Sequence, residues 1–229
     1  MKRRDFIRLT GMGTLGLLFT GCGIFSDKAA SPVIAAENAG PVAEGVKGKK
    51  ILVAFFSRKG DNYEVGYIEK GNTHILADMI AEELPGADVF EIKTVKEYAA
   101  DYRACTEEAK AEKEQDARPQ LATKIPNFQD YDIVFLGYPI WWSDLPMPVY
   151  TFMESYDWQG KTVIPFCTSA GDVMTGLEDR VIPRYAKGAQ VKLPGLGLSG
   201  KRVQQETESV RPQVKEWLKN LGIDVHANV

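Results

Sequence analysis

The residues best suited to chemistry are two adjacent tryptophans, Trp141 and Trp142. They follow a short apolar run that ends at Gly137, and a turn containing Pro139 and Ile140 lies between. In open α/β sheets, ligands bind outside the carboxyl ends of the strands. Because an indole is large and its N–H needs a partner, two indoles at a strand end suit the wall of a site for a flat aromatic ligand. The alternative is a Trp-rich corner of the core.

A second set of candidate residues surrounds an expected helix N-terminus. The apolar run 50–56 is typical of a strand buried on both faces, and Ser57 and Arg58 follow it directly. After an inserted segment come Asn72 and Thr73, and a helical pattern begins. Hydroxyls and small residues at such a place favour phosphate binding, because free backbone N–H groups and the helix dipole meet the anion there. Alternatively, Asn72 or Thr73 only caps the helix.

A third motif has the same form, an apolar run at 164–167 that leads into small residues. These residues are Thr168, Ser169, Ala170 and Gly171. The three motifs, each after a strand-like run, together resemble the flavodoxin-like family over residues 49–221. In that family the first loop wraps the FMN phosphate, whereas the other two contact the isoalloxazine ring. The inserted segment 61–70 departs from the family's short first loop.

The resemblance implies a fold and a cofactor. The fold is a three-layer α/β/α sandwich with a five-stranded parallel sheet in the order 2-1-3-4-5, and FMN lies where strands one and three diverge. The implied cofactor-binding residues are Ser57, Arg58, Asn72, Thr73, Pro139, Ile140, Trp141, Trp142, Thr168, Ser169, Ala170 and Gly171.

The rest of the pattern agrees with such a sheet, because strand-like and helix-like segments alternate. We expect strands at 50–56, 88–92, 132–137, 162–167 and, more weakly, 190–198. We expect helices at 73–84, 95–116, 147–156, 176–185 and 206–220. The strongly charged part of the second helix, from residue 99, predicts a solvated face.

The inserted segment 61–70 is less polar than a surface excursion normally is, since it includes Tyr63, Val65, Tyr67 and Ile68. We therefore expect it to pack on the protein, as a flap that narrows access to the flavin ring. The alternative is a hairpin packed elsewhere on the surface.

The first 48 residues predict an export signal and a tether. Residues 2–8 resemble a twin-arginine signal, and the apolar segment 9–19 is shorter than the about 20 residues of a membrane span. Residues 19–22 resemble a lipoprotein cleavage box with Cys22 as the lipidated residue. We expect a signal at 1–21, a flexible tether at 22–48 and an FMN-binding domain at 49–229. The mature protein would be exported across the bacterial cytoplasmic membrane to the periplasmic or cell-surface face, where its lipid anchors it. A plain cleaved signal is the alternative.

Composition narrows the function classes. The net charge is −3 and the first eight residues carry +3, so the remainder is about −6, which argues against nucleic acid as a partner. Two histidines make no case for a metal site, and Cys105 and Cys167 are expected to be buried thiols.

We therefore expect an FMN-binding redox protein that carries electrons to or from an unknown partner protein or small-molecule acceptor. One alternative is an FMN-dependent NAD(P)H- or quinone-type oxidoreductase. Another, of a different class, is a flavin-free surface lipoprotein that acts as a binding module.

Overall fold

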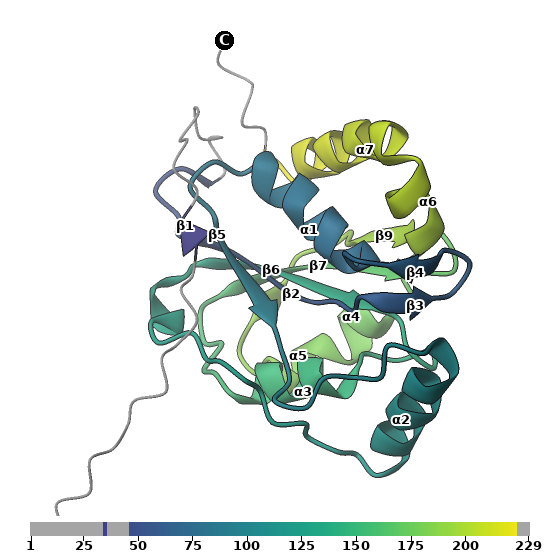
Figure 1. The fold of residues 1–229 in the computed structure, drawn as a ribbon. Coiled ribbons are helices and arrows are strands. Elements are labelled where there is room, and N and C mark those ends of the chain that lie inside the picture. Colours follow the sequence, from purple (N-terminus) through teal and green to yellow (C-terminus); the bar gives the residue numbers. More distant parts are fainter. Residues whose placement is uncertain (1–33, 36–45, 224–229) are drawn as a thin grey trace, which may run out of the picture.

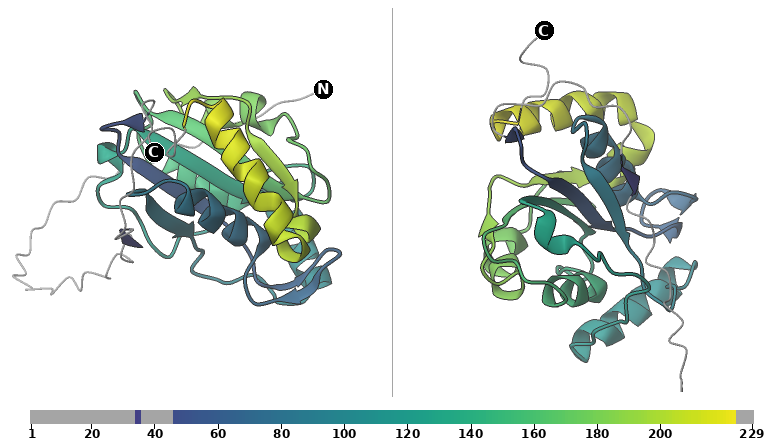
Figure 2. Two further views of the ribbon diagram at one scale, coloured as in Figure 1. Left: turned by 90° about the horizontal axis from the view of Figure 1, so that it is seen from above. Right: turned by 90° about the vertical axis from the view of Figure 1, so that its left-hand side faces the viewer.

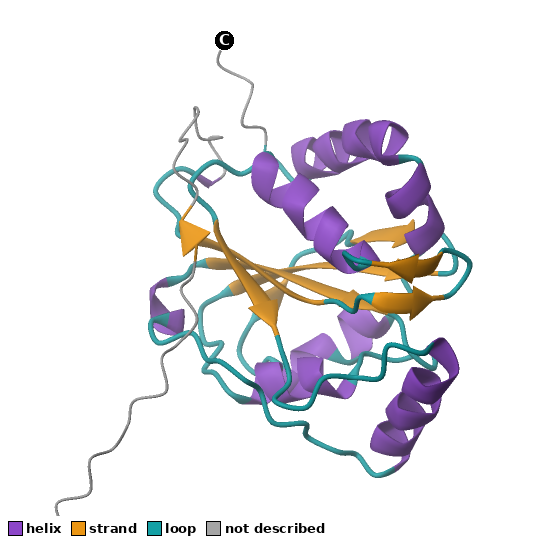
Figure 3. Ribbon diagram, in the orientation of Figure 1, coloured by secondary structure: helices purple, strands orange, loops and turns teal. Residues whose placement is uncertain are grey.

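The computed structural model describes residues 34–35 and 46–223, in which a twisted sheet lies between two layers of helices (Figures 1 and 3). The strands of this sheet are β1 (Ile34–Ala35), β2 (Ile51–Phe56), β5 (Asp88–Ile92), β6 (Ile133–Pro139), β7 (Thr162–Ser169), β8 (Gln190–Val191) and β9 (Leu196–Ser199). The predicted signal 1–21 and Cys22 lie outside the described residues.

The sheet has the predicted order. Its central strands run β5-β2-β6-β7 and are all parallel, and both β8 and β9 pair with β7 in parallel. This confirms the order 2-1-3-4-5, with the weak fifth strand formed as two short pieces. In addition, β1 pairs antiparallel with the outer edge of β5. It comes from the segment expected to be a tether, in which Val46 also lies buried in the core.

Helices cover both faces of the sheet (Figure 2). One face carries α1 (Asn72–Glu82), α6 (Gly200–Gln205) and α7 (Thr207–Asn220), and the other carries α3 (Met147–Glu154), α4 (Leu177–Arg180) and α5 (Ile182–Tyr185). A seventh helix, α2 (Tyr102–Glu114), stands off the sheet near its carboxyl edge (Figure 1). No helix among the described residues is long and apolar enough to cross a membrane.

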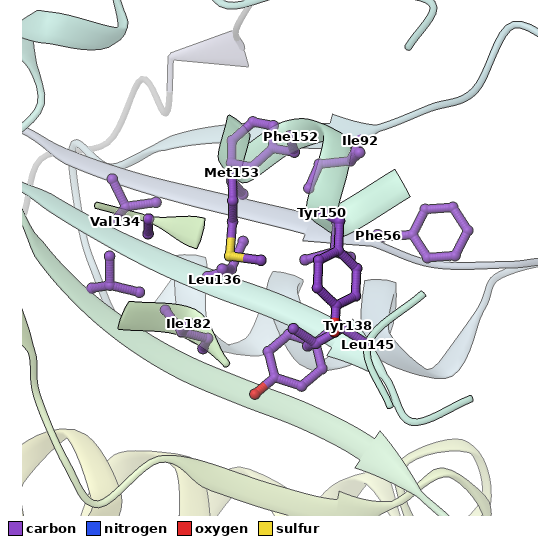
Figure 4. Packing of buried hydrophobic residues seen from close by; sticks show 14 of the residues in the cluster. Phe56, Ile92, Val134, Leu136, Tyr138, Leu145, Tyr150, Phe152, Met153 and Ile182 are labelled. Atoms are coloured by element: carbon purple, nitrogen blue, oxygen red, sulfur yellow. The ribbon is translucent and has the colours of Figure 1, made fainter. Parts of the chain in front are cut away.

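Alternation along the strands explains the two cores. In β2, Val53 and Phe55 belong to the cluster under α1 and α7, whereas Leu52 and Ala54 belong to the cluster under α3. All six residues of β2 are buried, as expected for a strand covered on both faces. The cluster on the α3 face brings the side chains of Leu136 and other strand residues against helix residues such as Phe152 and Met153 (Figure 4).

Two predicted helices differ from the structure. The helix expected at 95–116 begins only at Tyr102, because the Asp101 carboxylate caps it by accepting from the Ala104 N–H at 2.7 Å. The helix expected at 176–185 is two short helices that meet at Val181. Pro183, which cannot donate to a continuing helix, lies in the first turn of the second one.

The inserted segment forms a two-stranded antiparallel hairpin, β3 (Gly60–Asn62) and β4 (Gly66–Ile68). Its tyrosines do not pack inward, since Tyr63 is 56% and Tyr67 is 61% exposed. The segment does contact the rest of the protein, since the Asp61 N–H donates to the Ala100 carbonyl at 2.8 Å and the Tyr63 ring lies 6.3 Å from that of Tyr102, but neither tyrosine ring is buried.

Candidate functional site

A cavity of about 470 Å³ lies where the carboxyl ends of the central strands meet the hairpin and α2. This volume is within the roughly 300–1,000 Å³ of small-molecule pockets. Nine of the twelve predicted cofactor residues line it: Arg58, Asn72, Pro139, Ile140, Trp141, Trp142, Thr168, Ser169 and Ala170. The other three, Ser57, Thr73 and Gly171, do not line it. The three motifs therefore meet at one place.

The first motif is drawn tightly around the start of α1. A Cβ at Gly71 would lie 2.2 Å from Ser57 Oγ and 2.5 Å from the Arg58 carbonyl oxygen, so only glycine fits there. Ser57 Oγ accepts a hydrogen bond from the His74 N–H at 3.1 Å, which leaves the Ser57 O–H proton available to another acceptor. The Asn72 side chain lines the cavity, and its buried Oδ1 has no partner within the described structure.

A hydroxyl pair joins the first and third motifs. Thr73 Oγ1 and Thr168 Oγ1 are 2.8 Å apart and both residues are buried. Thr73 thus sits behind the cavity rather than at its surface, and it fixes α1 to the end of β7.

Arg58 was predicted to bind the cofactor beside its phosphate, but its side chain is bonded to the protein backbone instead. Its guanidinium donates to the carbonyl oxygens of Ala99 and Ala100, each at 2.6 Å, and to that of Asp61. These bonds attach the hairpin to the segment that precedes α2. Arg58 lines the cavity, but backbone carbonyls engage its donors.

Trp141 forms the inner aromatic wall. Its ring makes edge contacts with Phe56, at 5.3 Å between centroids, and with Tyr98, at 5.1 Å. Its backbone N–H and carbonyl both pair with Asp144 at 2.9 Å. Trp141 is therefore held on one side by the core and presents its remaining surface to the cavity.

Trp142 forms the outer wall and is held in a strained turn. Its φ of 51° and the φ of 58° at Ser143 lie in the left-handed region, which costs a non-glycine residue about 1–3 kcal/mol. Contacts with α2 offset this cost: the indole N–H donates to the Thr106 carbonyl at 2.9 Å, and Lys113 Nζ donates to the Trp142 carbonyl at 2.7 Å. The side chain stays 48% exposed.

Three groups of lining residues were not predicted as binding residues. They are Tyr102, Cys105, Thr106, Glu107 and Ala109 of α2; Asn62, Tyr63 and Glu64 at the hairpin; and Ser199, Gly200 and Lys201 after β9. The last group repeats the pattern of a strand followed by small residues, and a Cβ at Gly200 would lie 2.2 Å from Asn72 Nδ2. That signal was present in the sequence, but the fifth strand was weakly defined. The residues of α2 were missed because its many charged residues predicted a solvated face, although one side of the helix lines the cavity.

Two buried thiols flank the site. Cys105 and Cys167 are free, as expected. Burial raises the pKa of Cys105 to about 11, against the opposing charge of Arg58, and burial with the nearby Glu178 raises the pKa of Cys167 to about 12. Both therefore stay protonated near neutral pH.

The comparison that decides the family covers most of the chain: a family model described as flavodoxin matches residues 50–221. The chain belongs to the flavodoxin family. Membership agrees with the parallel order of the sheet. The cavity lies at the carboxyl edge of this sheet, which is where such a fold binds ligands.

Solved structures support the same membership. A flavoprotein from Bacteroides uniformis is 32% identical, with a TM-score of 0.58 over 75% of this chain and 99% of that one. One from Bacteroides eggerthii is 28% identical, with a TM-score of 0.57 over 77% and 100%. The flavoprotein of Lactobacillus acidophilus, solved in complex with FMN, shares the fold at 20% identity and a TM-score of 0.50 over 70% and 99%. No curated protein matches.

Proposed function

We propose that this member of the flavodoxin family is an FMN-binding redox protein, exported and held at the membrane by a lipid on Cys22. The observation that carries the FMN assignment is a single cavity that joins an aromatic wall, Trp141 and Trp142, to the N-terminus of α1. A flavin mononucleotide has the matching parts, a flat ring system and a terminal phosphate.

The residues present fit this cofactor. The N-cap of α1 is Gly71, which has no side chain to occupy the first-turn N–H groups, and Ser57 takes only that of His74. An anion is therefore favoured at this end of the helix. The unpartnered Asn72 Oδ1 is a buried acceptor, and a hydroxyl on the flavin's sugar chain is a donor of the kind that it lacks.

Bound FMN would supply the electron-transfer chemistry, and the protein supplies binding, orientation and electrostatics. Here Trp141 and Trp142 would flank the ring, and residues of the hairpin and α2 would line the rest of the site. The electron donor or acceptor would be a partner protein or a small molecule. The recess formed by the hairpin and α2 favours the second candidate function, an FMN-dependent oxidoreductase with a small-molecule substrate.

Export is supported by the sequence of residues 1–22, which lie outside the described residues. The twin-arginine route carries folded proteins, so FMN can be loaded in the cytoplasm before transport. The Cys22 lipid would then keep the domain at the periplasmic or cell-surface face.

Purified protein tests the assignment. We expect a yellow protein whose acid-released cofactor co-elutes with FMN in chromatography, because the start of α1 would take one terminal phosphate and the sequence contains no second Gly-rich nucleotide fingerprint. Released FAD would contradict the cofactor. A colourless protein that takes up no FMN on titration would instead support the flavin-free binding module.

A further inference from the structure

Three exposed aromatic side chains from distant parts of the chain line the same cavity. Tyr63 comes from the turn of the hairpin, Tyr102 is the first residue of α2, and Trp142 follows β6. We call these three residues the aromatic rim. Figure 1 shows the hairpin and α2 at the same end of the sheet, beyond the carboxyl ends of the strands.

The three rings of the rim are partly exposed to solvent, but contacts within the protein hold them in place. Tyr63, Tyr102 and Trp142 are 56%, 43% and 48% exposed. The rings of Tyr63 and Tyr102 are 6.3 Å apart and inclined by 36°, and the indole N–H of Trp142 is bonded to α2. Exposed apolar surface next to a cavity indicates a binding site, because covering that surface with a ligand removes it from water, which lowers the free energy.

Charge at the cavity indicates what this surface takes. Its charged lining residues in the described chain are Arg58, Lys201, Glu64 and Glu107, which sum to zero, and beside the lining Lys110 Nζ lies 5.8 Å from the centroid of the Trp142 ring. Backbone carbonyls already engage the Arg58 donors. The lining therefore has neither the single-sign field that steers a charged protein partner nor the cation cluster that a dinucleotide's phosphates need.

We propose that the aromatic rim is a second subsite of the cavity, which binds an uncharged, planar aromatic molecule beside the FMN. This inference rests on the proposed function. It selects a small aromatic compound over both a docking protein and a nicotinamide dinucleotide. Tyrosine and tryptophan faces recognise such a molecule by offset or edge stacking, which needs no charge.

The test uses the full FMN-loaded chain in its oxidised state, with 1,4-naphthoquinone as the probe, so that binding is measured without electron exchange. Calorimetric titration should give one saturable site. Tyr63→Ala and Tyr102→Ala should each weaken it roughly three- to tenfold, the factor expected for one aromatic contact. Tyr63→Phe should restore most of the affinity, since the ring face is what binds.

The same hairpin offers a matched control. Tyr67 is as exposed as Tyr63 but faces a different surface hollow, so Tyr67→Ala should leave naphthoquinone binding unchanged. NADH at equal concentration should not displace the probe. Competition by NADH at similar affinity, or equal losses in the Tyr63 and Tyr67 variants, would overturn the proposal.

The FMN content of each sample, read from flavin absorbance, separates the two proposals. A chain that holds FMN but shows no saturable naphthoquinone binding would refute the subsite and leave the proposed function standing. A chain that takes up no FMN would refute the proposed function. If Tyr63→Ala weakens FMN and naphthoquinone by the same factor, Tyr63 belongs to the cofactor's own site and the separate subsite is wrong.

Discussion

At the scale of single residues, the Thr73–Thr168 pair decides whether the first and third motifs are held together. Removing one hydroxyl leaves the other buried without a partner, so Thr73→Val should lower the free energy of unfolding by about 1–3 kcal/mol. The double variant Thr73→Val/Thr168→Val should recover most of this loss, because both hydroxyls are gone. Denaturant unfolding of the two single variants and the double variant gives the coupling; additive losses would contradict a direct bond.

Substituting the two tryptophans should cost different amounts of stability, because their environments differ. Trp141 packs on Phe56 and Tyr98, so Trp141→Ala should destabilise the protein by a substantial part of the roughly 3–5 kcal/mol of a buried tryptophan. Trp142 is half exposed and strained, so Trp142→Ala should cost much less stability. In both variants, fluorescence of bound FMN should rise as quenching is relieved. Unchanged quenching and FMN affinity in the double variant would mean that neither indole lines the flavin.

The thiols should be inert in the folded protein. The thiolate is the form that reacts, and with pKa values of about 11 and 12 for Cys105 and Cys167 almost none is present at pH 8. In a Cys22→Ser variant, a maleimide should therefore label neither cysteine until the chain is unfolded, when mass spectrometry should show two additions. Rapid labelling of the native protein at Cys105 would indicate that α2 opens readily.

At the scale of elements, the hairpin is the departure from a short phosphate loop. A deletion that joins Gly60 to Asn72 removes Asp61, one of the carbonyl partners through which Arg58 attaches the hairpin to the segment before α2. We expect faster release of FMN, measured by stopped-flow fluorescence, because one side of the cavity is opened. If the deletion variant keeps its FMN release rate and its reactivity toward quinones and nicotinamides, the hairpin is not a flap.

At the scale of the whole molecule, the N-terminal prediction is independent of the fold. Replacing Arg3 and Arg4 by lysine should keep the protein in the cytoplasm, and Cys22→Ala should leave it unlipidated and either released or stalled, since each change removes the feature that the export or lipidation step reads. Cell fractionation and mass spectrometry of the mature N-terminus check both. An unmodified Cys22 in exported protein would remove the anchor and keep the export.

The sequence by itself determined the buried strand-like runs and the three loops that follow them, whereas the order of the strands was implied by the resemblance to the flavodoxin-like family. Runs such as 50–56 and 164–167 are buried on both faces, and small residues follow them, so these signals are local and can be read without knowing the fold. Tertiary structure decided which side chains meet. The Thr73–Thr168 pair joins residues 95 apart in sequence, and the bond from Trp142 to Thr106 spans 36. Arg58 lies at the position predicted for a phosphate ligand, but carbonyl groups of the segment at 99–101 engage it. Local pattern specifies which face of a strand or helix is buried, whereas the partner of a polar side chain depends on segments that only folding brings together.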